Sequence, residues 1–186
     1  MGTQTIRFKR TATAFLILLL SGPMAVAQEA DLDPLFQQLI DADDTSHGQV
    51  ATKILRELER SGSATMDLLY RRGTDALEER EHGVAVEHFT ALVDHAPEFA
   101  EGYHGRATAY FNLGYVGPAL EDLRRTLELE PRHFQALFGL GNVMESLERP
   151  KDALEVYQAV LDIYPLDPKT LAAIDRVELI LRGQTL

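Results

Sequence analysis

The chain has 186 residues, a formal net charge of −11 and no cysteine. This length allows one domain or a short array of repeats, and a chain without disulfides is held together by apolar packing. The acidic balance argues against nucleic acid and anionic lipid as partners and favours basic ones, although it also serves solubility alone.

The first residues have the layout of a secretory signal peptide. Three basic residues in MGTQTIRFKR precede the apolar run AFLILLL, and the small residues of Ala25-Val26-Ala27 follow. Because a membrane-spanning helix needs about 20 apolar residues, we favour cleavage after Ala27 over retention of residues 1–27 as an anchor. We therefore predict export to the bacterial periplasm without stable membrane insertion, and a net charge of −14 once the three basic residues are removed.

Residues 28–65 are predicted to form an N-terminal helical pair. Two amphipathic segments, 33–43 and 48–61, carry apolar residues at helical spacing. These residues are Leu35, Phe36, Leu39, Ile40, Val50, Ile54, Leu55 and Leu58. We favour a cap on the region that follows over a degenerate copy of its repeat, and whether the pair instead occupies a groove stays open.

From residue 66 the sequence repeats with a period of 34 residues, the kind of signal that marks a stacked array. Pro97, Pro131 and Pro165 fall on this interval. Proline lacks a backbone N–H and biases the preceding residue away from helix, so each one is predicted to end a helix. The predicted units are 66–99, 100–133 and 134–167.

Within each unit the apolar places predict two helices that approach closely. Places four, eight and eleven form one helical stripe, and places twenty and twenty-four lie on a second helix. Position eight of each 34-residue unit carries a small residue and position twenty-four carries a large one. The large side chain of the second helix fills the space beside the small residue of the first helix. The eighth holds Gly73, Ala107 and Gly141, and the twenty-fourth holds Phe89, Leu123 and Tyr157.

These units resemble the tetratricopeptide repeat, a helix–turn–helix of 34 residues. The resemblance implies an all-α protein, an α-α superhelix of three repeats. The seventh place, usually leucine in the family, holds Arg72 and Arg106 in the first two units and Leu140 in the third. An arginine there is expected to bury its stem and to find a carboxylate or carbonyl partner.

Residues 168–186 are predicted to form a C-terminal capping helix, because stacked repeats need an end with a polar outer face. Leu171, Ile174 and Val177 are expected on its inner side.

The resemblance further implies that the first helix of each unit lines a concave face. We predict a partner-binding groove there, with a ring at the fifth place of every unit and acidic groups beside it. Its predicted residues are Asp67, Tyr70, Thr74, Glu78, Glu101, His104, Thr108, Phe111, Phe138, Asn142 and Glu145. Exposed rings are typical of binding surfaces, and the acids favour a basic or apolar polypeptide. The alternative is that the rings pack against the N-terminal helices.

Some members of the family grip the C-terminal carboxylate of a chaperone with lysine, asparagine and arginine at fixed inner places. Here those places hold Tyr70, Thr74, Gly105, Gln135 and Gly139. None of the clamp residues is present, which argues against that ligand.

Catalysis is the competing class of function. One hairpin carries several residues that can bind metal or move protons: His82, Glu87, His88, Asp94 and His95. The sequence has no His-Glu-x-x-His motif, and His82 and His88, which are six positions apart, do not share a helix face. We predict no catalytic residue, no metal and no cofactor.

The favoured function is a non-catalytic interaction module of the periplasm that binds another exported protein or peptide segment. The alternative is an accessory subunit that completes an envelope enzyme or assembly complex. A metal-dependent hydrolase ranks last, and it would require an activity that vanishes when His88 or His95 is replaced. Self-association through an end face of the array stays open.

Overall fold

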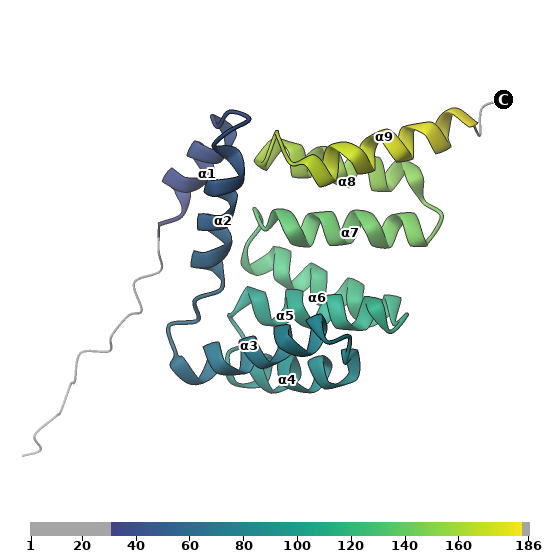
Figure 1. Cartoon of the computed structure of the whole chain (residues 1–186). Coiled ribbons are helices and arrows are strands. Elements are labelled where there is room, and N and C mark those ends of the chain that lie inside the picture. The colour runs from purple at the N-terminus through teal and green to yellow at the C-terminus, as the bar shows by residue number, and fades with distance from the viewer. Residues whose placement is uncertain (1–30, 184–186) are drawn as a thin grey trace, which may run out of the picture.

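The computed structural model describes residues 31–183, and within that range the chain is helical without a strand (Figure 1). The helices are α1 (Asp33–Ile40), α2 (His47–Leu58), α3 (Ala64–Glu78), α4 (His82–His95), α5 (Ala100–Asn112), α6 (Val116–Leu129), α7 (Phe134–Ser146), α8 (Pro150–Ile163) and α9 (Pro168–Gly183). The predicted signal peptide lies outside the described residues. No helix among residues 31–183 is long and apolar enough to cross a membrane.

Helices α3 to α8 form three pairs that stack in chain order. Helix α4 contacts α5, α6 contacts α7, and α8 contacts α9, so that the array rises from α3–α4 at the bottom of Figure 1 to α9 at the top. The predicted α-α superhelix is confirmed. Each second helix ends two residues before its proline, at His95, Leu129 and Ile163, as the periodic prolines predicted.

The small residues at the eighth place allow the close approach that the sequence predicted. A Cβ added at Gly73 would lie 2.7 Å from the Phe89 ring, and one added at Gly141 would lie 2.2 Å from the Tyr157 ring. Both rings are fully buried. Hence the ring of the second helix occupies the volume that a side chain of the first helix would need.

Arg106 has the carboxylate partner that its place in the repeat required. Its Nε and Nη2 donate to the two carboxylate oxygens of Asp122 at 2.7 and 2.8 Å. Arg72 differs, because it lies on the outer side of the first repeat and is exposed.

The first repeat has an end face of its own. Gly102 of the second repeat faces α4, and a Cβ there would meet Val93 at 2.9 Å. The equivalent residue of the first repeat is Leu68, which is 42% exposed, and Arg71 and Asp75 beside it are exposed as well. The later repeats have small residues at this face, where the helix of the preceding repeat packs. The first repeat has charged residues there, so its end face is stable in water without a helix that covers it.

The N-terminal pair therefore does not cap the start of the array, and the expectation of such a cap was wrong. Its buried residues, among them Phe36, Leu39 and Ile54, form one apolar cluster with Phe134 of α7 and Tyr164 at the end of α8. Figure 1 shows α1 and α2 on the left, beside the ends at which α5 and α7 begin. The pair thus packs against the third repeat, about 100 residues further along the chain.

The C-terminal helix packs with two of its three predicted inner residues against the array. Val177 is buried and Ile174 packs against the same core cluster, whereas the prediction for Leu171 was wrong, because it is 42% exposed and Thr170 is buried instead. The buried Thr170 is positioned by Asp167, which accepts hydrogen bonds from its backbone N–H at 3.2 Å and from its hydroxyl at 2.5 Å. This contact satisfies a backbone N–H in the first turn of α9 and holds Thr170 on the buried side.

Candidate functional site: the inner face of the array

The first helices of the three repeats, α3, α5 and α7, contact one another in order and form the inner face. Toward their C-terminal ends this face is accessible. Glu78 and Thr108 are exposed, and Thr74, Phe111 and Asn142 are half-buried. Of the predicted groove residues, these five lie where a partner can reach them.

The rings at the fifth place are half-buried and packed within the chain. Tyr70 meets Phe99 edge-on at 5.9 Å between ring centroids. Phe138 lies 5.5 Å from the Tyr157 ring and also contacts the apolar cluster of the N-terminal helices. These rings consequently contribute more to packing than the sequence pattern predicted, and Phe138 lies against the apolar cluster that the N-terminal helices share with α7 and α8.

Two predicted groove acids are engaged by other parts of the chain. Asp67 accepts hydrogen bonds from the backbone N–H of Ser61 at 3.0 Å and from its hydroxyl at 2.5 Å. Glu145 receives two bonds from Arg176 of α9, at 2.6 and 3.1 Å, and its pKa is lowered chiefly by that guanidinium. Both carboxylates are therefore already hydrogen-bonded within the chain, and Arg176 balances the charge of Glu145.

Glu101 corrects the prediction of an exposed acidic groove residue, because it is only 2% exposed. Its Oε1 lies 3.0 Å from Nε2 of His133, and its Oε2 lies 3.4 Å from Nδ1 of His104. Burial raises the pKa of the Glu101 carboxyl, but the two histidines outweigh burial and hold that pKa well below its usual value. Burial also lowers the pKa of His104. Glu101 is thus an ionised internal group that joins α5 to α7.

The same three residues form a group with metal-ligand chemistry, since their ligand atoms lie within 4.8 Å of one another. The hydrogen bonds of His133 argue against a metal. Its Nδ1 accepts the backbone N–H of Ala136 at 3.1 Å as the N-cap of α7, so its proton is on Nε2 and is donated to Glu101. A metal on Nε2 would shift the proton to Nδ1, opposite the Ala136 N–H. The residues present do not fit a metal, and the contacts account for the cluster as a hydrogen-bonded lock.

The carboxylate of Glu101 also acts on two titratable groups near the end of α2. Burial, followed by the carboxylates of Glu101 and Glu59, raises the pKa of the Tyr70 hydroxyl. Burial and Glu101 likewise raise the pKa of Glu59, the residue that caps the C-terminus of α2. Electrostatics therefore connect the N-terminal pair with the inner ends of α3 and α5.

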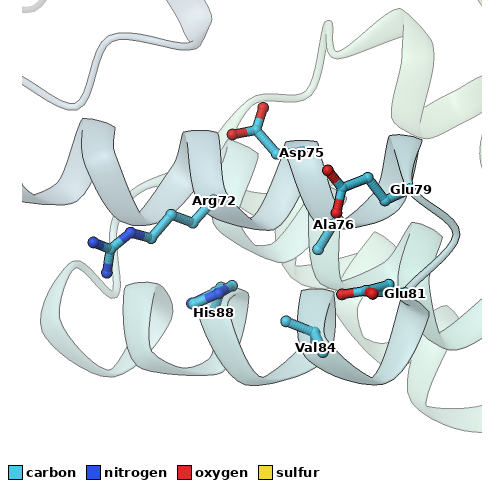
Figure 2. Close-up of a pocket in the computed structure, with 7 residues that line it drawn as sticks. All are labelled: Arg72, Asp75, Ala76, Glu79, Glu81, Val84 and His88. Carbon is cyan, nitrogen blue, oxygen red and sulfur yellow. The ribbon is translucent and has the colours of Figure 1, made fainter.

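The residues named for the catalytic alternative lie on the hairpin of α3 and α4, and only one of them lines a cleft there. A shallow cleft of about 370 Å³ lies at the outer face of the first repeat. Figure 2 shows the residues that line it, which are Arg72, Asp75 and Ala76 of α3, the capping residues Glu79 and Glu81 of the turn, and Val84 and His88 of α4. His88 is its one member from the predicted hairpin cluster. Among residues 31–183 no metal-ligand group includes His82, His88 or His95.

Sequence reasoning missed His133, Ser61 and Arg176, each of which engages a predicted groove acid from a distant or preceding segment. His133 carried one local signal, because it directly precedes a predicted helix, where a side chain can accept a backbone N–H. The sequence held no comparable signal for Arg176, which lies 31 residues from Glu145.

Comparison with known sequences gives a consistent picture. A family model described as tetratricopeptide repeat matches residues 105–168. A TPR repeat-containing protein of Rhizobium etli is 34% identical over 137 residues, which are 73% of this chain and 67% of that protein. The Hsp70-Hsp90 organizing protein 1 of Glycine max is 26% identical over 131 residues, or 70% of this chain but only 23% of the plant protein. The chain thus spans about a quarter of the length of that larger relative.

Solved structures show the same fold. The first TPR of Spaghetti (RPAP3), bound to the HSP90 peptide SRMEEVD, superposes with a TM-score of 0.60 at 20% identity and covers 63% of this chain and 93% of its own. The Yersinia enterocolitica type III secretion chaperone SycD, in complex with a peptide of the translocator YopD, gives a TM-score of 0.58 at 12% identity, with 63% and 95% covered. The 34-residue units, their stacking and these matches lead to one conclusion: the chain belongs to the tetratricopeptide repeat family.

Proposed function

We propose that the protein is a non-catalytic interaction module that binds a partner polypeptide on its inner face in the bacterial periplasm. Two of the structures that share its fold hold peptides, one of HSP90 and one of YopD. Repeats that stack into an array form an extended inner surface of the kind that holds a peptide segment.

The observation that carries the proposal is the accessible part of the inner face, toward the C-terminal ends of α3, α5 and α7. Glu78, Thr108, Asn112 and Ser146 are exposed there, and Phe111 is half-buried between them. A segment that places an apolar side chain against Phe111 and a cation near Glu78 fits these groups. The acidic balance of the whole chain supports a basic partner through its long-range field.

A chaperone C-terminus such as EEVD is a poor fit. The places that would supply clamp cations hold Tyr70 and Gly105 among others, and Tyr70 lies near the carboxylates of Glu59 and Glu101. An acidic peptide end would be repelled by these carboxylates, of which Glu101 is buried and Glu59 is exposed. We therefore propose a different class of ligand from that of the solved RPAP3 domain.

The test is a pull-down from envelope extract with the mature chain, residues 28–186. Thr108→Arg places a bulky cation in the accessible part of the inner face, whereas Glu155→Arg makes a comparable change at an exposed position on α8. We expect a partner that is retained by the wild type and by Glu155→Arg but lost with Thr108→Arg. Equal retention by both variants would refute binding at this face.

The location has its own test. If residues 1–27 are a cleaved signal peptide, the protein recovered from a periplasmic extract begins at Gln28. Intact-mass measurement of the recovered chain decides this, and a mass that retains Met1 or the apolar run would contradict export by cleavage.

A further inference from the structure

The N-terminal arm, defined here as residues 31–60, binds the third repeat much as a separate ligand would. It presents one apolar face, and Phe36, Leu39, Val50 and Ile54 on that face are each no more than 2% exposed. The arm does not stack on the first repeat. The end face of that repeat, which a stacked helix pair would cover, is exposed to solvent. The arm is thus an amphipathic helical segment laid on a surface that α7 and α8 supply.

The receiving surface is specialised in the third repeat. It consists of Phe134, Leu137 and Phe138 from the first turns of α7, and Val160 and Tyr164 from the end of α8. The fifth place of the other two repeats carries the more polar Tyr70 and His104 instead of phenylalanine. Apolar residues are therefore concentrated in the repeat on which the arm lies.

Polar contacts hold the arm mainly at its periphery. Nδ1 of His47 lies 2.6 Å from the Tyr164 hydroxyl. Arg132 bonds to Asp33 at 2.7 Å and lies over the Phe36 ring at 4.1 Å. The side chains of Arg132 and Asp33 are 40% and 78% exposed, respectively, so water competes for this ion pair. These contacts align the arm, while the apolar face supplies most of the attachment.

A short hinge connects the arm to the array. Residues 61–63 separate it from α3, and Gly62 has a φ of +75°, a left-handed conformation that glycine adopts readily. Ser61 is fixed to Asp67 on α3, so the array side of the hinge is anchored when the arm moves. Release of the arm would leave the stacking contacts of α3 to α9 unchanged.

From these contacts we propose that the arm is an intramolecular ligand that exchanges with a partner's amphipathic helix on the α7–α8 surface. This inference rests on the proposed function and adds its regulation. The accessible part of the inner face is open at all times, whereas the apolar surface of the third repeat becomes available only when the arm is released. A partner that supplies both a segment for the inner face and an apolar helix would displace the arm.

The probe is a fluorescent peptide with the sequence of residues 31–60, titrated into the mature chain. In the wild type the tethered arm competes at a high effective concentration, so the peptide should bind weakly. Ile54→Glu places a charge in the arm's buried face and should raise the peptide's affinity by about 100-fold. Ile40→Glu is the matched control, because Ile40 lies in the same arm but is 44% exposed, and it should behave like the wild type.

A folded Ile54→Glu chain that binds the peptide no better than the wild type would overturn the proposal. If that variant does not fold, hydrogen exchange on the unaltered mature chain tests independently whether the arm opens on its own. We expect the amides of α2 to open before those of α5 to α7. If the amides of α2 exchanged hydrogen only through global unfolding, the arm would be permanently bound to the third repeat. That result would refute the proposal that a partner's helix displaces the arm. Loss of partner binding in Thr108→Arg, by contrast, concerns the inner face alone.

Discussion

Replacement of Gly141 by alanine tests the packing rule that builds the array. The new Cβ would lie 2.2 Å from Cε1 of Tyr157, where ordinary van der Waals contacts begin at 3.4 Å. The ring would have to move by more than 1 Å. The Tyr157 side chain is fully buried, and its hydroxyl oxygen lies within hydrogen-bond distance of both Asn142 and Glu145, at 2.8 and 2.7 Å, so little adjustment is available.

Two opposing effects set the magnitude. Overpacking a core costs about 1–3 kcal/mol, and strain on the two hydroxyl bonds adds about 1 kcal/mol. Alanine in place of glycine within a helix returns about 1 kcal/mol. We expect Gly141→Ala to lower the free energy of unfolding by about 2 kcal/mol, which in a chain of this size lowers Tm by about 4–8 °C.

Urea and thermal unfolding of the mature chain measure this effect. Gly83→Ala is the matched control, because a Cβ at Gly83 meets nothing within 4 Å, and its stability should equal or slightly exceed that of the wild type. If Gly141→Ala proved as stable as Gly83→Ala, close approach at the eighth place would not be what fixes the helix pair.

Three further results are expected. Arg106→Met leaves the buried Asp122 carboxylate unpaired and should cost about 3 kcal/mol in urea unfolding, whereas Arg72→Met, at the equivalent but exposed place, should change stability by less than about 0.5 kcal/mol; similar losses in both would refute the role of the Asp122 pair. Glu101 has a lowered pKa, so its stabilisation is present above its unfolded value of about 4.5 and is lost as pH falls. The lowered pKa of His104 acts in the same direction below about 6.5. Urea midpoints should therefore fall from pH 7 to pH 4, and less steeply in Glu101→Gln; a variant that follows the wild-type profile would remove Glu101 from the explanation. His133→Ala removes the side chain that accepts the Ala136 N–H and contacts Glu101, and it should speed hydrogen exchange at Ala136; unchanged exchange there would contradict the capping contact.

The repeat itself could be predicted from the sequence because its determinants are local and periodic. The prolines after α4, α6 and α8 act on the residue immediately before them. Gly141 and Tyr157 lie within one helix pair, so their sizes indicate the contact directly. The Arg106–Asp122 pair likewise joins two places of a single unit, which is why an acidic partner for the arginine was foreseeable.

Contacts between distant segments could not be read in the same way. Glu101 looked like an exposed acid, because the frame places it on the inner face, yet His133 covers it from the start of the next repeat. Asp67 was predicted to face a partner, but the preceding hinge uses it through Ser61. The arm's position depends on apolar residues of the third repeat, and an amphipathic pattern shows that a helix has a partner without showing which one.

The central claim is that the inner face of the array holds another protein's segment, and photo-crosslinking in the bacterial envelope tests it most directly. A crosslinking amino acid at Thr108, exposed on α5, is compared with the same group at Glu155, exposed on α8. We predict a discrete adduct with an envelope protein from position 108 and none of that mass from position 155. The same adducts from both positions, or none from position 108 in cells that contain the exported protein, would contradict the claim.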